Sequence, residues 1–134
     1  VQGISVITLK PLETALMIAP GQYVYFHLHE EKFPFSIAEQ RADSSLVFHL
    51  RHGASHPQAQ ALLEHLKTVG RIPLSGPFGK CVLPNPPQPC LFIAGGTGIS
   101  PHQALIDHAL SLSFKQIELY WGLRNLEDCY LQAW

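Results

Sequence analysis

The chain has 134 residues, of which 46% are hydrophobic and only 14% are charged, and its formal net charge is −1. This composition is typical of a globular protein with a buried core, and the near-zero charge excludes the basic surface expected for binding nucleic acid or an anionic membrane. No apolar run approaches the roughly 18 residues of a membrane-spanning helix and nothing resembles a signal peptide, so we expect a cytoplasmic protein.

Short extended segments separated by proline and glycine turns dominate the first 83 residues. We expect strands at 1–10, 23–29, 32–38, 45–52, 71–75 and 80–83, and one helix at 58–69 whose buried side is Ala61, Leu62, Leu66 and Val69. Many short strands of this kind favour a barrel, because closure removes exposed sheet edges. We therefore predict an antiparallel β-barrel domain over residues 1–83.

A proline-rich segment, PNPPQP at 84–89, follows and is predicted to be a linker, because its four prolines cannot join a ladder or a helix. Residues 90–94, CLFIA, form an apolar run of the length expected for a strand buried on both faces. The alternating run at 116–121 predicts a second strand, parallel to the first. Residues 126–134 resemble the opening of another helix.

A glycine-rich turn joins the first of these strands to a helix predicted at 101–112. It contains Gly95, Gly96, Thr97 and Gly98, followed by Ser100 and then Pro101. Glycines let a ligand approach the backbone amides closely, and Ser100 is expected to cap the helix. Free amides and the positive end of a helix dipole together form an anion site. The alternative is a tight turn without a ligand.

Five segments, taken together, resemble the ferredoxin-NADP reductase superfamily and, within it, the NAD(P)H:flavin oxidoreductases. They are GQY at 21–23, PFSIA at 34–38, GPFG at 76–79, IAGGTGISP at 93–101 and YWGLR at 120–124. They occur in family order and at family spacing over nearly the whole chain. The resemblance implies a flavin-binding Greek-key barrel, followed by the beginning of a Rossmann-like parallel-sheet domain at 90–134.

The resemblance also implies that NAD(P)H passes a hydride to a flavin across the boundary between the two parts. Phe35 would lie against the isoalloxazine ring, with Pro34 and Ile37 beside it, and Ser36 would be the catalytic residue near N5. Gly95, Gly96, Thr97, Gly98 and Ser100 would hold the nicotinamide nucleotide. The flavin would be FAD, FMN or free riboflavin, bound as a cofactor or released as a product, and an iron–sulfur protein or an oxygenase would accept the electrons.

The chain departs from the family pattern at the flavin phosphate. The family has an arginine two residues before the aromatic residue, where this chain has Phe33. Lys32 or Arg51 are candidate replacements, although lysine lacks the bidentate fork of arginine. Ser55, at the start of the helix predicted at 58–69, either holds a flavin phosphate or belongs to a plain turn.

Other readings remain open at this stage. Arg124 either pairs with a cofactor phosphate or is a solvated turn residue. The histidines and the cysteines Cys81, Cys90 and Cys129 have no metal-site spacing, so we predict no metal.

A family member would have a further strand before residue 1 and a longer nucleotide domain, so a fragment is expected. The function is then that of an oxidoreductase, of a flavin- or nucleotide-binding module in an electron-transfer chain, or of a non-catalytic reductase remnant.

Overall fold

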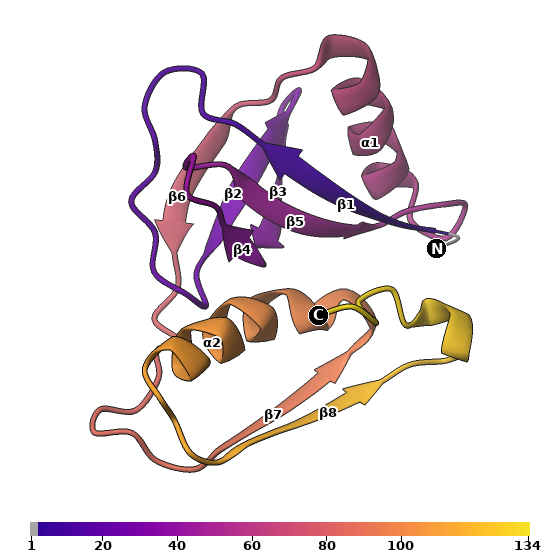
Figure 1. Cartoon of the computed structure of the whole chain (residues 1–134). Coiled ribbons are helices and arrows are strands. Elements are labelled where there is room, and N and C mark those ends of the chain that lie inside the picture. Colours follow the sequence, from indigo (N-terminus) through magenta and orange to yellow (C-terminus); the bar gives the residue numbers. More distant parts are fainter. Residues whose placement is uncertain (1–2) are drawn as a thin grey trace.

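A computed structural model describes residues 3–134 and shows six short antiparallel strands before a parallel pair (Figure 1). The antiparallel strands are β1 (Ile4–Leu9), β2 (Tyr23–Leu28), β3 (Glu31–Ser36), β4 (Glu39–Gln40), β5 (Leu46–Arg51) and β6 (Leu74–Phe78). They form two three-stranded sheets, ordered β1-β5-β4 and β3-β2-β6. The predicted strand at 1–10 extends to two residues outside the described part of the chain.

The two sheets enclose a single apolar core. Phe26 of β2 and Phe48 of β5 are 1% and 0% exposed, and their rings meet edge to face with centroids 4.8 Å apart. Residues 46–50 of β5 are all buried, so this strand is covered on both faces rather than on one. Helix α1 (Pro57–Val69) adds Leu62 and Leu63 to the same core.

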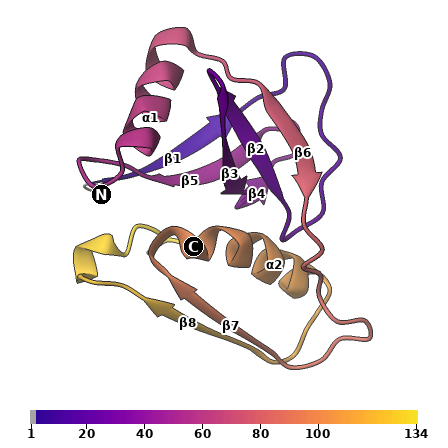
Figure 2. The same ribbon diagram turned by 180° about the vertical axis from the view of Figure 1, so that it is seen from behind.

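The second unit consists of β7 (Cys90–Gly95), the 3₁₀ turn η1 (Gly96–Gly98), α2 (Ile99–Ser111), β8 (Ile117–Gly122) and the 3₁₀ turn η2 (Leu126–Asp128). Strands β7 and β8 pair in parallel from Cys90 with Ile117 to Gly95 with Gly122, which confirms the predicted parallel pair. Helix α2 lies between this pair and the antiparallel sheets, at the end of the barrel away from α1 (Figures 1 and 2).

Several sequence predictions are wrong in detail. Strand β7 is covered on one face only, since Leu91 and Ile93 are 59% and 70% exposed. Residues 80–83 form no strand, because β6 instead runs through Gly76 and Pro77 to Phe78. The two-residue strand β4 was not predicted. The start of a helix expected at 126–134 is the short turn η2. In α1, Leu63 is buried while Ala61 and Val69 are exposed.

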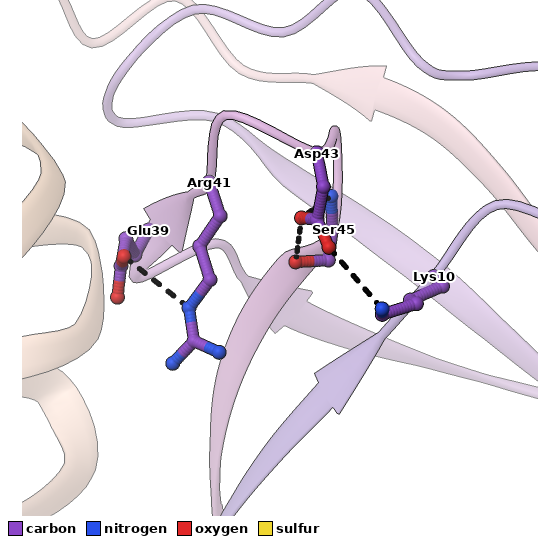
Figure 3. A network of polar contacts seen from close by, with 5 residues as sticks. All are labelled: Lys10, Glu39, Arg41, Asp43 and Ser45. Atoms are coloured by element: carbon purple, nitrogen blue, oxygen red, sulfur yellow. Dashed lines mark hydrogen bonds and ion pairs between the residues drawn. The ribbon is translucent and has the colours of Figure 1, made fainter.

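A polar network fixes the turn between β4, which contacts α2, and β5, which contacts η1 (Figure 3). Asp43 accepts hydrogen bonds from the Ser45 hydroxyl at 2.6 Å and the Ser45 amide at 3.1 Å, and pairs with Lys10 at 3.3 Å. The Ser45 bonds, and then Lys10, lower the pKa of Asp43 to about 2. Arg41 pairs with Glu39 at 3.4 Å. The network thus holds the turn that pairs β4 with β5, next to α2.

No helix among residues 3–134 combines the length and the apolar character that a bilayer crossing requires.

Candidate functional site

The glycine turn lies at the boundary between the barrel and the parallel pair. Gly95 is extended, at φ −128°, and Gly96 has φ +52°, in the left-handed region that favours glycine. A Cβ placed on Gly96 would lie 3.3 Å from a terminal nitrogen of Arg51. Gly95 and Gly98 have open space where a Cβ would be. The turn therefore has free space at Gly95 and Gly98, whereas Gly96 packs closely against the Arg51 guanidinium.

Arg51 is the last residue of β5 and reaches the turn from the barrel side. Its neighbour along the strand face, His49, is also directed to this boundary, because residues two apart in a strand share a face. Arg51 is half-buried and has no ion pair with a carboxylate among the pairs found in residues 3–134. Of the predicted site residues, Arg51 and Gly96 are thus brought together from opposite sides of the boundary.

Two aromatic residues that the sequence prediction did not include support the turn from the other side. The indole N–H of Trp121, in β8, donates to the Gly96 carbonyl at 2.8 Å. Tyr130 packs edge to face on Trp121 with centroids 5.5 Å apart and on His49 at 5.1 Å. The Tyr130 hydroxyl oxygen lies 2.9 Å from His49 Nδ1. A chain of contacts therefore runs from β5 through Tyr130 and Trp121 to Gly96.

Burial keeps both members of the His49–Tyr130 pair neutral. It lowers the pKa of His49 from 6.5 to about 4 and raises the pKa of the Tyr130 phenol, against the opposing charge of Arg51. A buried group resists its charged form because water no longer solvates it. The pair is therefore a hydrogen bond between two uncharged groups at neutral pH.

The buried His49 should make the protein sensitive to acid. Its folded pKa, about 4, lies below the unfolded value of 6.5, so the unfolded chain binds the proton more tightly. The histidine's contribution to stability is present above pH 6.5 and is lost as the pH falls toward 4, at a cost on the order of 2–3 kcal/mol. Urea unfolding from pH 7 to 4 should show this loss, and His49→Gln should largely remove it. The exposed His108→Gln is the control, and an unchanged slope in His49→Gln would contradict the assignment.

The helix after the turn begins differently from the prediction. Helix α2 starts at Ile99 with Gly98 as its N-cap. Ser100 does not cap it: its hydroxyl donates to the Thr97 carbonyl at 2.8 Å, and its side chain is buried. The expectation that Ser100 accepts from first-turn amides is wrong, because the 3₁₀ turn brings that carbonyl within reach. The first-turn amides have no side-chain cap.

The segment predicted to hold a flavin ring occupies the last half of β3. Phe35 is half-buried and its ring lies 4.7 Å, centroid to centroid, from that of the core residue Phe26. Pro34 is exposed and Ser36 is half-buried. Ile37 is 1% exposed and belongs to the core, and its amide donates to the Gln22 carbonyl at 3.1 Å, so the predicted contact of Ile37 with a flavin has no exposed group in this structure. The end of β3 leads directly into β4, which contacts α2.

Two predicted phosphate contacts have protein partners in this structure. Arg124 Nε lies 3.5 Å from Asp128 Oδ2, and Ser55 Oγ lies 2.9 Å from Nδ1 of His56, the residue that precedes α1.

A cavity of about 340 Å³ lies between the β2–β3 hairpin and the start of α1, and Phe33 and Pro57 line it. Phe33 therefore faces the first turn of α1. Residues 3–134 contain no group of three or more potential metal ligands.

Comparisons with known proteins agree with this arrangement. Residues 92–134 match the family described as Oxidoreductase NAD-binding domain. The NAD(P)H-flavin reductase of Vibrio harveyi is 35% identical over 95% of this chain and 56% of its own length. The ferredoxin–NAD(P)+ reductase component of the Pseudomonas putida naphthalene 1,2-dioxygenase system is 32% identical over 90% of this chain and 37% of its length.

Solved structures show the same fold. A cytochrome P450 reductase from Amycolatopsis superposes with a TM-score of 0.78, at 24% identity, over 98% of this chain and 42% of that one. Phthalate dioxygenase reductase gives a TM-score of 0.75, at 14% identity, over 92% and 40%. The chain thus has the fold of the reductases of the ferredoxin-NADP reductase superfamily. Within that group it resembles the NAD(P)H-flavin reductases and the reductase components of dioxygenase systems, and it spans about two fifths to just over half of their lengths.

Sequence reasoning missed His49, Trp121 and Tyr130 as members of the site. Trp121 is part of the YWGLR segment and of the strand predicted at 116–121, but no role in the site was predicted for it. The partners His49 and Tyr130 lie 81 positions apart. Sequence patterns over a few residues cannot predict a contact between residues so far apart in the chain. The YWG segment, which ends β8, was the one available signal, since an indole N–H in a half-buried position normally finds an acceptor.

Proposed function

We propose that this chain forms the flavin-binding barrel and the beginning of the nucleotide domain of an NAD(P)H-dependent flavin oxidoreductase, with domains at 1–83 and 90–134 joined by a linker at 84–89. The observation that carries the proposal is the contact between Arg51 of the barrel and Gly96 of the glycine turn. It brings a barrel residue that we assign to the flavin phosphate next to the turn that we assign to the nicotinamide nucleotide. The likeness to named flavin and ferredoxin reductases supports the same reaction.

The residues at the end of β3 suit a flavin ring. Phe35 offers an aromatic face and is backed by the buried Phe26, which limits its movement. Ser36 has a hydroxyl that can donate or accept a hydrogen bond, and we assign it the contact near the reacting nitrogen. When bound, the flavin supplies a ring that accepts the hydride, and the protein supplies position and distance.

The residues near the glycine turn suit phosphate groups. Arg51 provides a guanidinium that pairs with no carboxylate among residues 3–134, beside the glycines and the uncapped first turn of α2. Gly95, Gly96, Thr97 and Gly98 would carry the nicotinamide nucleotide through their backbone. Near the start of α1, Ser55 is proposed for the flavin phosphate, where Phe33 replaces the arginine of the family.

The electron acceptor is proposed from the likeness to relatives. Several relatives are reductase components of dioxygenase systems, so an iron–sulfur or oxygenase partner in the cytoplasm is the acceptor we favour for this chain.

Flavin titrations test our assignment of Arg51 to the flavin phosphate. The chain would be titrated with riboflavin, FMN and FAD while flavin fluorescence is recorded. Arg51→Gln should weaken FMN and FAD about tenfold, because a charge-assisted bond to phosphate is lost, and should leave riboflavin unchanged. Arg41→Gln, in the exposed β4–β5 turn, is the matched control. Phe33→Arg should favour FMN over riboflavin, because its new cation would face the first turn of α1.

The contrary result would be an equal loss for riboflavin and FMN, or no loss at all. If Arg51→Gln weakened NADH or NADPH and no flavin, Arg51 would belong to the nucleotide and its assignment to the flavin would be wrong.

A further inference from the structure

The glycine turn is held between two side chains that come from different parts of the fold. From the barrel, Arg51 lies against Gly96. From β8, the Trp121 indole donates to the carbonyl of the same residue at 2.8 Å. The peptide at Gly96 is therefore restrained on both sides, although the turn has open space at Gly95 and Gly98.

Trp121 is itself restrained by Tyr130. The two rings meet at 82°, edge to face, and Tyr130 also meets the ring of His49 at 89°. Tyr130 is the only residue among those described that contacts both rings in this way. Its hydroxyl, 2.9 Å from His49 Nδ1, ties it to the same strand that carries Arg51.

We propose that Trp121 and Tyr130 are positioning residues that fix the glycine turn at a set distance from β5, so that the nucleotide held by the turn meets the flavin site. Strand β5 is the common reference, because His49 and Arg51 are two residues apart on it. The inference rests on the proposed function for the identity of the ligand. The contact chain that it describes is independent of any ligand.

The geometry explains why both residues are needed. A single hydrogen bond to Gly96 leaves the indole free to swing with its own strand, whereas Tyr130 packs on the ring and is anchored to a buried histidine. Loss of the Trp121 bond should release the turn directly. Loss of the Tyr130 hydroxyl should release it indirectly and by less, because the ring contacts remain.

Hydrogen exchange tests the inference on the chain without ligand. In Trp121→Phe, which keeps an aromatic ring but removes the indole N–H, amides at 95–98 should exchange about fivefold faster. Tyr130→Phe should give about a twofold increase. Trp134→Phe is the matched control, because it removes an equivalent indole bond, to Asp107 at 2.9 Å, away from the turn. It should leave exchange at 95–98 unchanged.

Binding measurements then separate positioning from general stability. The dissociation constant for NADH or NADPH should rise more in Trp121→Phe than in Tyr130→Phe, while that for FMN stays within twofold of the parent in both variants. Unchanged exchange at 95–98 in Trp121→Phe would overturn the inference. So would an increase that spreads equally to α1 and the barrel strands. If the turn loosens as expected but the parent chain binds neither nucleotide, the inference stands and the proposed function fails.

Discussion

Phe26→Ala should lower the free energy of unfolding by about 3–5 kcal/mol, the usual cost of removing a buried phenylalanine ring. Phe26 is 1% exposed and lies between Phe35, at 4.7 Å, and Phe48, at 4.8 Å between ring centroids. Its removal leaves a cavity where the two sheets meet. Urea unfolding followed by tryptophan fluorescence would measure the change.

The same substitution should also weaken flavin binding, because Phe35 would lose the ring that backs it. Phe78→Ala is the matched control: Phe78 is 41% exposed and has only the rings of Tyr23 and Tyr25 as aromatic neighbours, so its loss should cost about 1 kcal/mol. Equal losses of unfolding free energy in Phe26→Ala and Phe78→Ala would contradict the placement of the core.

Gly21→Ala should cost about 2–5 kcal/mol for two separate reasons. Gly21 has φ +89°, which strains any residue with a Cβ by about 1–2 kcal/mol. Its Cβ would lie 2.6 Å from the Cys81 carbonyl oxygen and 3.2 Å from the Leu105 side chain of α2. Backbone must shift to relieve such a contact, at about 1–3 kcal/mol more.

Gly70→Ala separates the two causes. Gly70 ends α1 at φ +73°, and a Cβ there would meet nothing within 4 Å. Gly70→Ala should therefore show only the backbone strain, and the difference in unfolding free energy between Gly21→Ala and Gly70→Ala measures the steric clash at Gly21. Thermal unfolding of both variants gives the comparison, and a Gly70 variant as unstable as the Gly21 variant would contradict the close approach of the Cys81 carbonyl and Leu105 to Gly21.

The order and type of most elements could be predicted from the sequence, because period and punctuation are local. The run YVYFHLH alternates, and it forms β2. What failed depends on tertiary structure. The exposed face of β7 could not be read from CLFIA, since an apolar run does not report what covers it. The two-residue strand β4 has no period at all.

The site shows the same division. The glycine turn and the PFS segment were recognisable because their residue types are unusual at that spacing. The contact between Arg51 and Gly96 joins residues 45 positions apart in the printed sequence, and its form depends on how the barrel packs against α2. The residue type of Ser100 suits a helix cap, which accepts a hydrogen bond from an amide. In the structure the preceding 3₁₀ turn places the Thr97 carbonyl where the Ser100 hydroxyl donates to it instead.

The most direct test of the account is an anaerobic spectral titration of the flavin-loaded chain with NADH or NADPH. If the ring site at Phe35 and Ser36 faces the glycine turn at residues 95–98, the two redox rings stack. We then predict a long-wavelength charge-transfer band that fades as the flavin's visible absorbance is lost. Binding of both molecules with no such band and no loss of flavin absorbance would contradict the account.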